Sequence, residues 1–179
     1  YYSINNNWRD KKPIFQLDEK DKSDLKMLLH ELNVPDDSWF VCFHGRTGDF
    51  RPEVEFAHSH RNSDILSLAR AMDLVRDMGG VPIRMRTTTK DEKFPGLPCI
   101  DYASSHLASD RNDLLLCAGA KLFVGCSSGL FVLASVFGTP VTLVNMVPMS
   151  HFPFTVRDRF ILKKFFRLSS NKMASYQDI

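Results

Sequence analysis

The sequence has few of the features that mark secreted, membrane-spanning or nucleic-acid-binding proteins. No apolar run approaches the roughly 20 residues that cross a bilayer, and the first residues do not resemble a secretory signal. The four cysteines are widely spaced and form no Cys-x-x-Cys pair, so neither a zinc site nor a disulfide framework is indicated. The 23 basic and 21 acidic residues leave a net charge of only +2, which gives no general basic field for nucleic acid. We therefore expect a cytoplasmic protein without a nucleic-acid partner.

The 179 residues, 44% of them hydrophobic, suit one globular domain with a substantial core. Residues 1–18 are rich in Asn and charge and predict an N-terminal arm or linker. Residues 19–179 predict a single α/β domain, a Rossmann-like parallel sheet with helices on both faces. From about residue 155, basic residues alternate with aromatic and aliphatic ones. This pattern predicts a C-terminal helical tail that docks on the domain, or alternatively touches a membrane surface.

The most informative stretch joins two predicted strands. A short apolar run leads into the turn Ser127-Ser128-Gly129, which is followed by an apolar helix over 130–137 and a buried strand over 140–144. Such a unit places backbone N–H groups and hydroxyls beyond the carboxyl end of a strand, where open α/β sheets bind phosphate. In the alternative interpretation a serine only caps the helix and the glycine only lets the chain turn.

Alternating strands and helices account for most of the remaining chain. We predict strands over 39–43, 81–86 and 99–102, and helices from Asp18 to the Val34-Pro35 stop, from Ser63 to Met78 and over 111–120.

The first of these strands delivers His44-Gly45-Arg46-Thr47-Gly48-Asp49 at its carboxyl end. Arg46 offers a planar donor fork for phosphate, and the imidazole of His44 exchanges protons near neutral pH. Alternatively, Arg46 pairs with Asp49 at the surface and His44 is inert.

Arg84 lies in a strand that we expect to be covered on both faces. A buried guanidinium needs an anionic partner, which is either Asp101 or a bound phosphate. His58 and His60 lie in a long polar loop over 50–62, but no third ligand stands at a suitable spacing, so we predict no metal site.

Several of these segments, taken in order, resemble a family of glycosyltransferases found with bacterial surface-polysaccharide genes. The likeness rests on His44–Asp49, His60–Asp64, Gly79–Met85, Ile100–Ala103 and Phe123–Gly129. The element His44-x-Arg46-x-Gly48-Asp49 is also distantly similar to one in GT-B fold fucosyltransferases, and the Ser-Ser-Gly turn to the donor-binding turn of heptosyltransferase-like enzymes.

The resemblance implies a donor-binding lobe that transfers a sugar from a nucleotide diphosphate sugar to a glycan or polysaccharide acceptor. It implies that Arg46 grips the diphosphate, while the Ser-Ser-Gly turn binds its oxygens. The nucleotide-sugar site implied in this way comprises His44, Gly45, Arg46, Arg84, Asp101, Ser127, Ser128 and Gly129. Candidates for the general base, chosen by their position at strand ends, are His44, Asp49 and His151. No Asp-x-Asp occurs, so we expect metal-independent chemistry with no cofactor.

The chain also departs from the GT-B pattern, which has two lobes, because it is long enough for only one. It does not begin with Met, which is compatible with a missing N-terminal lobe. Two alternatives therefore stay open: a noncatalytic nucleotide-binding or interaction domain, and a purely structural α/β domain with internally paired arginines. We expect a cytoplasmic location, with peripheral contact to the inner membrane through the basic tail as a further alternative.

Overall fold

The computed structural model describes residues 13–50, 52–87, 94–147 and 155–175. The helices in these ranges are α2 (Glu19–Glu31), α3 (Glu55–His58), α4 (Ala69–Asp77), α5 (Asp110–Gly119) and α6 (Gly129–Val136). The strands are β1 (Phe40–His44), β2 (Val81–Arg84), β3 (Leu122–Gly125), β4 (Val141–Met146), β5 (Arg159–Leu162), β6 (Phe166–Arg167) and β7 (Lys172–Met173). Short 3₁₀ turns lie at Gly48–Phe50, Pro52–Val54, Ser59–Arg61, Ile65–Leu68 and Tyr102–Ser104.

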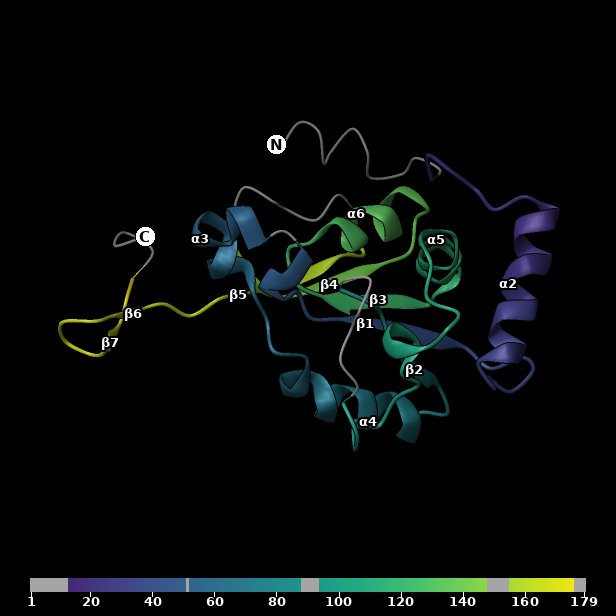
Figure 1. Ribbon diagram of the computed structural model, residues 1–179, viewed down its shortest axis with the longest axis horizontal. Coiled ribbons are helices and arrows are strands. Elements are labelled where there is room, and N and C mark those ends of the chain that lie inside the picture. The colour runs from purple at the N-terminus through teal and green to yellow at the C-terminus, as the bar shows by residue number, and fades with distance from the viewer. Residues whose placement is uncertain (1–12, 51, 88–93, 148–154, 176–179) are drawn as a thin grey trace.

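Five parallel strands form the central sheet in the order β2-β1-β3-β4-β5 (Figure 1). β1 lies between β2 and β3, and all five of its residues are buried, as expected for an apolar run covered on both faces. After β2 the chain crosses to the other side of β1, so the strand order reverses between β1 and β3. Open α/β sheets bind ligands beyond the carboxyl ends of the strands at such a switch point.

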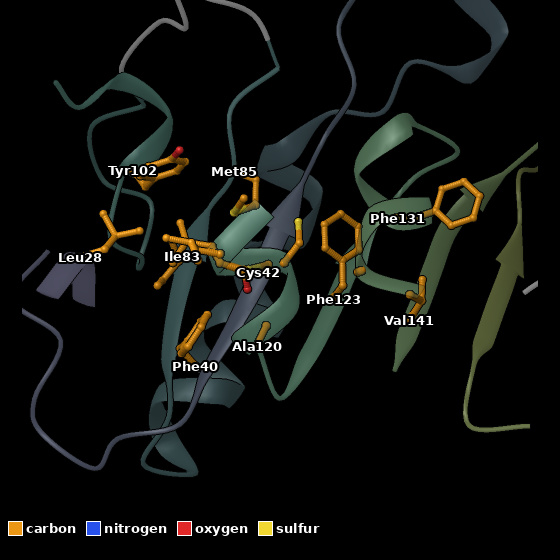
Figure 2. Packing of buried hydrophobic residues seen from close by; sticks show 14 of the residues in the cluster. Leu28, Phe40, Cys42, Ile83, Met85, Tyr102, Ala120, Phe123, Phe131 and Val141 are labelled. Atoms are coloured by element: carbon orange, nitrogen blue, oxygen red, sulfur yellow. The ribbon is translucent and has the colours of Figure 1, made fainter. Parts of the chain in front are cut away.

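Two layers of helices bury the faces of the sheet. Phe40 and Cys42 of β1 point into the larger cluster, with side chains from α2, α5 and α6, whereas Val41 and Phe43 point to the other face, toward the 65–68 turn and α4. Figure 2 shows the larger cluster, with Cys42 at its centre. Each large apolar side chain buried in this way contributes about 1.5–3 kcal/mol. The two layers hold β1 and β3 rigidly and therefore fix the position of the loops at their carboxyl ends.

The predicted strand over 99–102 is wrong. Only one bridge forms there, between Ile83 and Ile100, and a 3₁₀ turn begins at Tyr102. Asp101 has backbone angles (φ −87°, ψ 70°) outside the strand region, and its carboxylate accepts a hydrogen bond from Arg84. The chain therefore leaves the edge of β2 after a single residue of pairing.

The predicted helical tail from about residue 155 is also wrong, because residues 159–162 form strand β5 and the hairpin of β6 and β7 follows. The outer edge of β4 offers unpaired backbone groups, and Phe160 and Ile161 suit a strand. The buried carboxylate of Asp158 anchors the start of β5 by accepting hydrogen bonds from the amides of Val141 (2.8 Å) and Thr155 (2.7 Å). In Figure 1 the hairpin projects away from the sheet. None of the helices in the described ranges is long and apolar enough to cross a membrane.

The described end of the predicted N-terminal arm packs against α6. The Phe15 amide donates to the carbonyl oxygen of Val136 (3.1 Å), and the Phe15 ring lies 5.8 Å from that of Phe137. Asp18 then caps α2, because its side chain accepts a hydrogen bond from the Asp21 amide (2.7 Å). The division of the chain at residue 18 stays a prediction.

Candidate functional site

The chain segments that follow β1 and β3 run side by side at the switch point. His44 is paired with Gly125 in the sheet, and the Arg46 amide donates to the Cys126 sulfur at 3.2 Å. A Cβ at Gly45 would lie 2.7 Å from the carbonyl oxygen of Ser63, so only glycine allows the chain after the 50–62 loop to approach this closely. The structure thus brings the two main sequence motifs to the same edge of the sheet.

No side chain among the described residues caps the N-terminus of α6. Ser128 occupies the cap position with extended backbone, yet its hydroxyl makes no capping bond, is buried and has no partner among the described residues. The Ser127 hydroxyl instead accepts from the Val147 amide at 3.3 Å. A Cβ at Gly129 would meet nothing within 4 Å. The alternative of a simple capping serine is therefore not observed at Ser128, and the first turn of α6 keeps the N–H groups and positive dipole end that favour an anion.

Arg61 adds a positive charge to this turn. Its Nε and Nη2 atoms donate to the carbonyl oxygen of Ser127 at 3.1 and 2.7 Å. Within the described ranges Arg61 has no carboxylate partner. Burial, followed by the nearby charge of Arg46, lowers the pKa of Arg61 from its ordinary value. The sequence does not single out Arg61, because no local spacing reveals a contact that spans 66 residues.

The Arg46 side chain is held by the 50–62 loop. It pairs with Glu55 (Nη2 to Oε2, 3.1 Å), donates to the His58 carbonyl oxygen (3.2 Å) and also donates to the Asn62 side chain. The predicted alternative of a pair with Asp49 is wrong, since Glu55 takes that place and Asp49 is exposed. The backbone of Arg46 lies beside the Ser127 turn, but its guanidinium is occupied by an internal carboxylate.

Arg84 has the internal partner that its burial demands. Its Nε lies 2.6 Å from Oδ1 of Asp101, whose second oxygen accepts from the Ser104 hydroxyl (2.8 Å). The guanidinium also lies over the Phe94 ring, 4.9 Å from its centroid. The predicted pair is confirmed, while a role of either residue in ligand binding stays a prediction.

His44 ends β1 in a buried, electropositive environment. It is only 3% exposed, and its Nδ1 atom and the hydroxyl of Thr47 have no partner among the residues described. Burial, together with the charges of Arg46 and Arg84, lowers the pKa of His44 to about 4. The imidazole is therefore neutral at physiological pH. The third candidate base, His151, lies outside the described residues.

No cluster of metal-binding side chains lies in the described ranges. No three metal-binding side chains come together there, and the His58 and His60 rings are 6.4 Å apart. A surface hollow of about 390 Å³ lies along α2. It is lined by Lys26, Met27, His30, Glu31 and Asp36. Figure 1 shows α2 and α3 at opposite ends of the sheet.

Comparison with known proteins identifies the fold. No family model and no curated protein matches the chain. Among solved structures, ADP-heptose lipopolysaccharide heptosyltransferase II of E. coli matches with a TM-score of 0.61 and 16% identity, over 85% of this chain and 45% of that one. TibC from enterotoxigenic E. coli H10407, described as an iron-containing dodecameric glycosyltransferase, matches with a TM-score of 0.45 and 16% identity, over 68% and 32%. TibC in complex with ADP-D-β-D-heptose gives 0.45 and 17%, over 70% and 33%.

The first of these likenesses confirms the predicted fold class. The chain forms a five-stranded parallel sheet with helices whose fold is similar to that of the heptosyltransferase, and it spans less than half of that enzyme's length. The predicted links to surface-polysaccharide genes and to fucosyltransferases stay predictions. At this level of identity, the fold is what the comparison shows.

Proposed function

We propose that this chain is the donor-binding lobe of a glycosyltransferase, which moves a sugar from a nucleotide diphosphate sugar to a glycan or polysaccharide acceptor. The observation that carries the proposal is the cation at the uncapped helix start: Arg61 lies on the Ser127 carbonyl, beside the buried Ser128 hydroxyl, which has no partner among the described residues. Helix N–H groups and a guanidinium together match the oxygens of a diphosphate. The fold likeness to an enzyme named for ADP-heptose supports a nucleotide sugar as the ligand.

The same groups suit the chemistry of transfer. An acceptor hydroxyl loses its proton to a base and attacks the anomeric carbon, while the bond from that carbon to the diphosphate oxygen breaks. The departing diphosphate gains negative charge, which Arg61 and the α6 N-terminus are placed to stabilise without a metal ion. We keep His44 and Asp49 as candidate bases. His44 is unprotonated at neutral pH, as a base must be.

A noncatalytic nucleotide-binding or interaction domain is the second candidate. It is favoured by the depressed pKa of His44, about 4, because so weak a base removes a proton poorly at neutral pH. The candidates differ in outcome: the domain would bind nucleotides but show neither sugar transfer nor hydrolysis when joined to a second lobe.

Because this chain spans 45% of the heptosyltransferase, we propose that the acceptor site lies in a second lobe that precedes it. We also propose a cytoplasmic location. A peripheral contact with the inner membrane would use the basic segment after residue 155, which exposes Ile161 and Leu168 as well.

The proposal is tested by calorimetric titration with GDP, UDP, ADP and CMP sugars. We expect Arg61→Ala to weaken binding of the preferred donor about 10- to 100-fold, the effect of losing charge-assisted hydrogen bonds. The matched control is Arg70→Ala, which removes an equal charge from an exposed position of α4. Absence of binding by all four donor classes, or equal affinity of the two variants, would overturn the proposal.

A further inference from the structure

The Glu55 carboxylate occupies a cradle that suits an anion. Oε2 lies 3.1 Å from Nη2 of Arg46, and Oε1 accepts a hydrogen bond from the side-chain amide of Asn62. A Cβ at Gly48 would lie 2.5 Å from the Glu55 carboxyl carbon and 2.7 Å from Oε1, so the carboxylate rests directly on that glycine. One guanidinium, one amide and one glycine surface together enclose this internal anion.

The two ions of this pair are anchored very differently. The Arg46 backbone is bonded on both sides, its amide to the Cys126 sulfur (3.2 Å) and its carbonyl oxygen to the Ser63 amide (3.0 Å). Glu55 belongs to α3, a helix of four residues with no buried residue, and its side chain is 25% exposed against 11% for Arg46. Segments with so little buried surface open at low free-energy cost. The carboxylate is therefore the mobile partner and the guanidinium the fixed one.

Arg46 lies close to the proposed phosphate site. Its amide contacts Cys126, two residues before the Ser128 position that starts α6. Carboxylates and phosphates use the same planar donor fork of arginine, and a diphosphate carries more negative charge than one carboxylate. We infer that Glu55 is an internal competitor that holds Arg46 in the free protein and is displaced when a diphosphate binds. This inference rests on the proposed function.

Two substitutions remove the competitor by independent routes. Glu55→Gln removes the charge and keeps the shape. Gly48→Ala leaves the charge but places a methyl group where the carboxylate lies, and only the flexible end of Glu55 has to move. Gly48 does not have a positive φ, so alanine fits its backbone. Glu53→Gln is the matched control, because it removes the same charge from an exposed position on the preceding 3₁₀ turn.

The experiment is a calorimetric titration of each protein with inorganic pyrophosphate and with ADP, after thermal unfolding has shown that each variant is folded. We expect Glu55→Gln and Gly48→Ala to bind pyrophosphate about fivefold more tightly than the unmodified chain, the equivalent of one partly exposed ion pair. Glu53→Gln is expected to stay within about twofold.

The outcomes separate the two proposals. If the unmodified chain binds and Glu55→Gln binds no more tightly, the competitor role is overturned while the donor site stands. Equal tightening by Glu53→Gln also overturns it, because the effect would then be long-range charge. Failure of every protein to bind either ligand overturns the competitor role, and it overturns the proposed function as well only when none of the four donor classes binds.

Discussion

Replacing Ser128 with alanine is expected to raise the stability of the ligand-free protein while lowering its affinity for a nucleotide. A serine at a helix N-cap normally stabilises the protein, and its replacement by alanine costs about 0.5–2 kcal/mol. The Ser128 hydroxyl makes no capping bond and is buried without a described partner. Leaving a buried polar group unsatisfied costs about 1–3 kcal/mol. Ser128→Ala should therefore raise the free energy of unfolding of the ligand-free protein by about 1 kcal/mol, and certainly not lower it.

The chain contains a matched control for this substitution. Ser109 caps α5, and its hydroxyl accepts a hydrogen bond from the Asn112 amide at 3.2 Å. Ser109→Ala removes that bond and should lower the free energy of unfolding by about 1 kcal/mol. It lies at the start of a different helix, so it should leave nucleotide affinity unchanged.

Guanidinium chloride unfolding of both variants, with and without ADP, measures both effects. We expect Ser128→Ala to lose about tenfold in ADP affinity, since a hydrogen bond to a charged oxygen contributes about 1.5 kcal/mol. The reasoning is refuted if Ser128→Ala destabilises the free protein as much as Ser109→Ala. That result would mean that the Ser128 hydroxyl caps α6 in solution and is not free to form a hydrogen bond with a ligand.

Two further predictions concern buried polar side chains. Burial holds the pKa of His44 at about 4, below its ordinary value of 6.5, so the folded state binds fewer protons than the unfolded state between these values. The contribution of His44 to the free energy of unfolding should be constant above pH 6.5 and fall by on the order of 3 kcal/mol toward pH 4. In urea unfolding at a series of pH values, His44→Gln should reduce this pH dependence. An unchanged pH dependence would exclude His44 as its source. Asp158→Ala should lower the free energy of unfolding by about 2–3 kcal/mol, because the Val141 and Thr155 amides lose their acceptor. Hydrogen exchange at the Val141 amide measures this, and unchanged protection would show that Asp158 does not hold β5.

The centre of the sheet is predictable because its signals are local. Strands over 39–43 and 140–144 are predicted, and β1 and β4 form at Phe40–His44 and Val141–Met146. Both are short apolar runs next to proline, glycine or polar turns, and β1 is buried on both faces while β4 alternates buried and partly buried residues, as strands of an inner sheet do. The helix after the Ser127 turn is predictable for the same reason.

The periphery is not predictable in this way, because neighbours in space decide it. The segment over 159–162 is as compatible with an amphipathic helix as with a strand, and the free edge of β4 selects the strand. The segment over 99–102 has strand-like composition, yet the pair between Asp101 and Arg84 turns the chain away. Short apolar runs alone do not distinguish these outcomes.

In the candidate site too, some contacts can be predicted from the sequence and others cannot. The Arg84 pair with Asp101 follows from the cost of burying a guanidinium, which any sequence with a charged residue in a buried strand must meet. The roles of Glu55 and Arg61 depend on the path of the 50–62 loop. This loop is a series of one-turn elements without periodicity, so nothing in the sequence indicates which of its charged residues reach Arg46 or Ser127.

The ammonium group of Lys163 has a consequence for the order in which the protein is assembled. It donates to the carbonyl oxygens of His60 (3.0 Å) and Asn62 (2.8 Å), more than 100 residues earlier in the chain. Contacts this distant in sequence form late, because the chain between them must first be ordered. During synthesis the loop beside the candidate site therefore gains this anchor only after β5 has emerged, so a nascent chain that ends before Lys163 lacks this tie between the loop and the sheet.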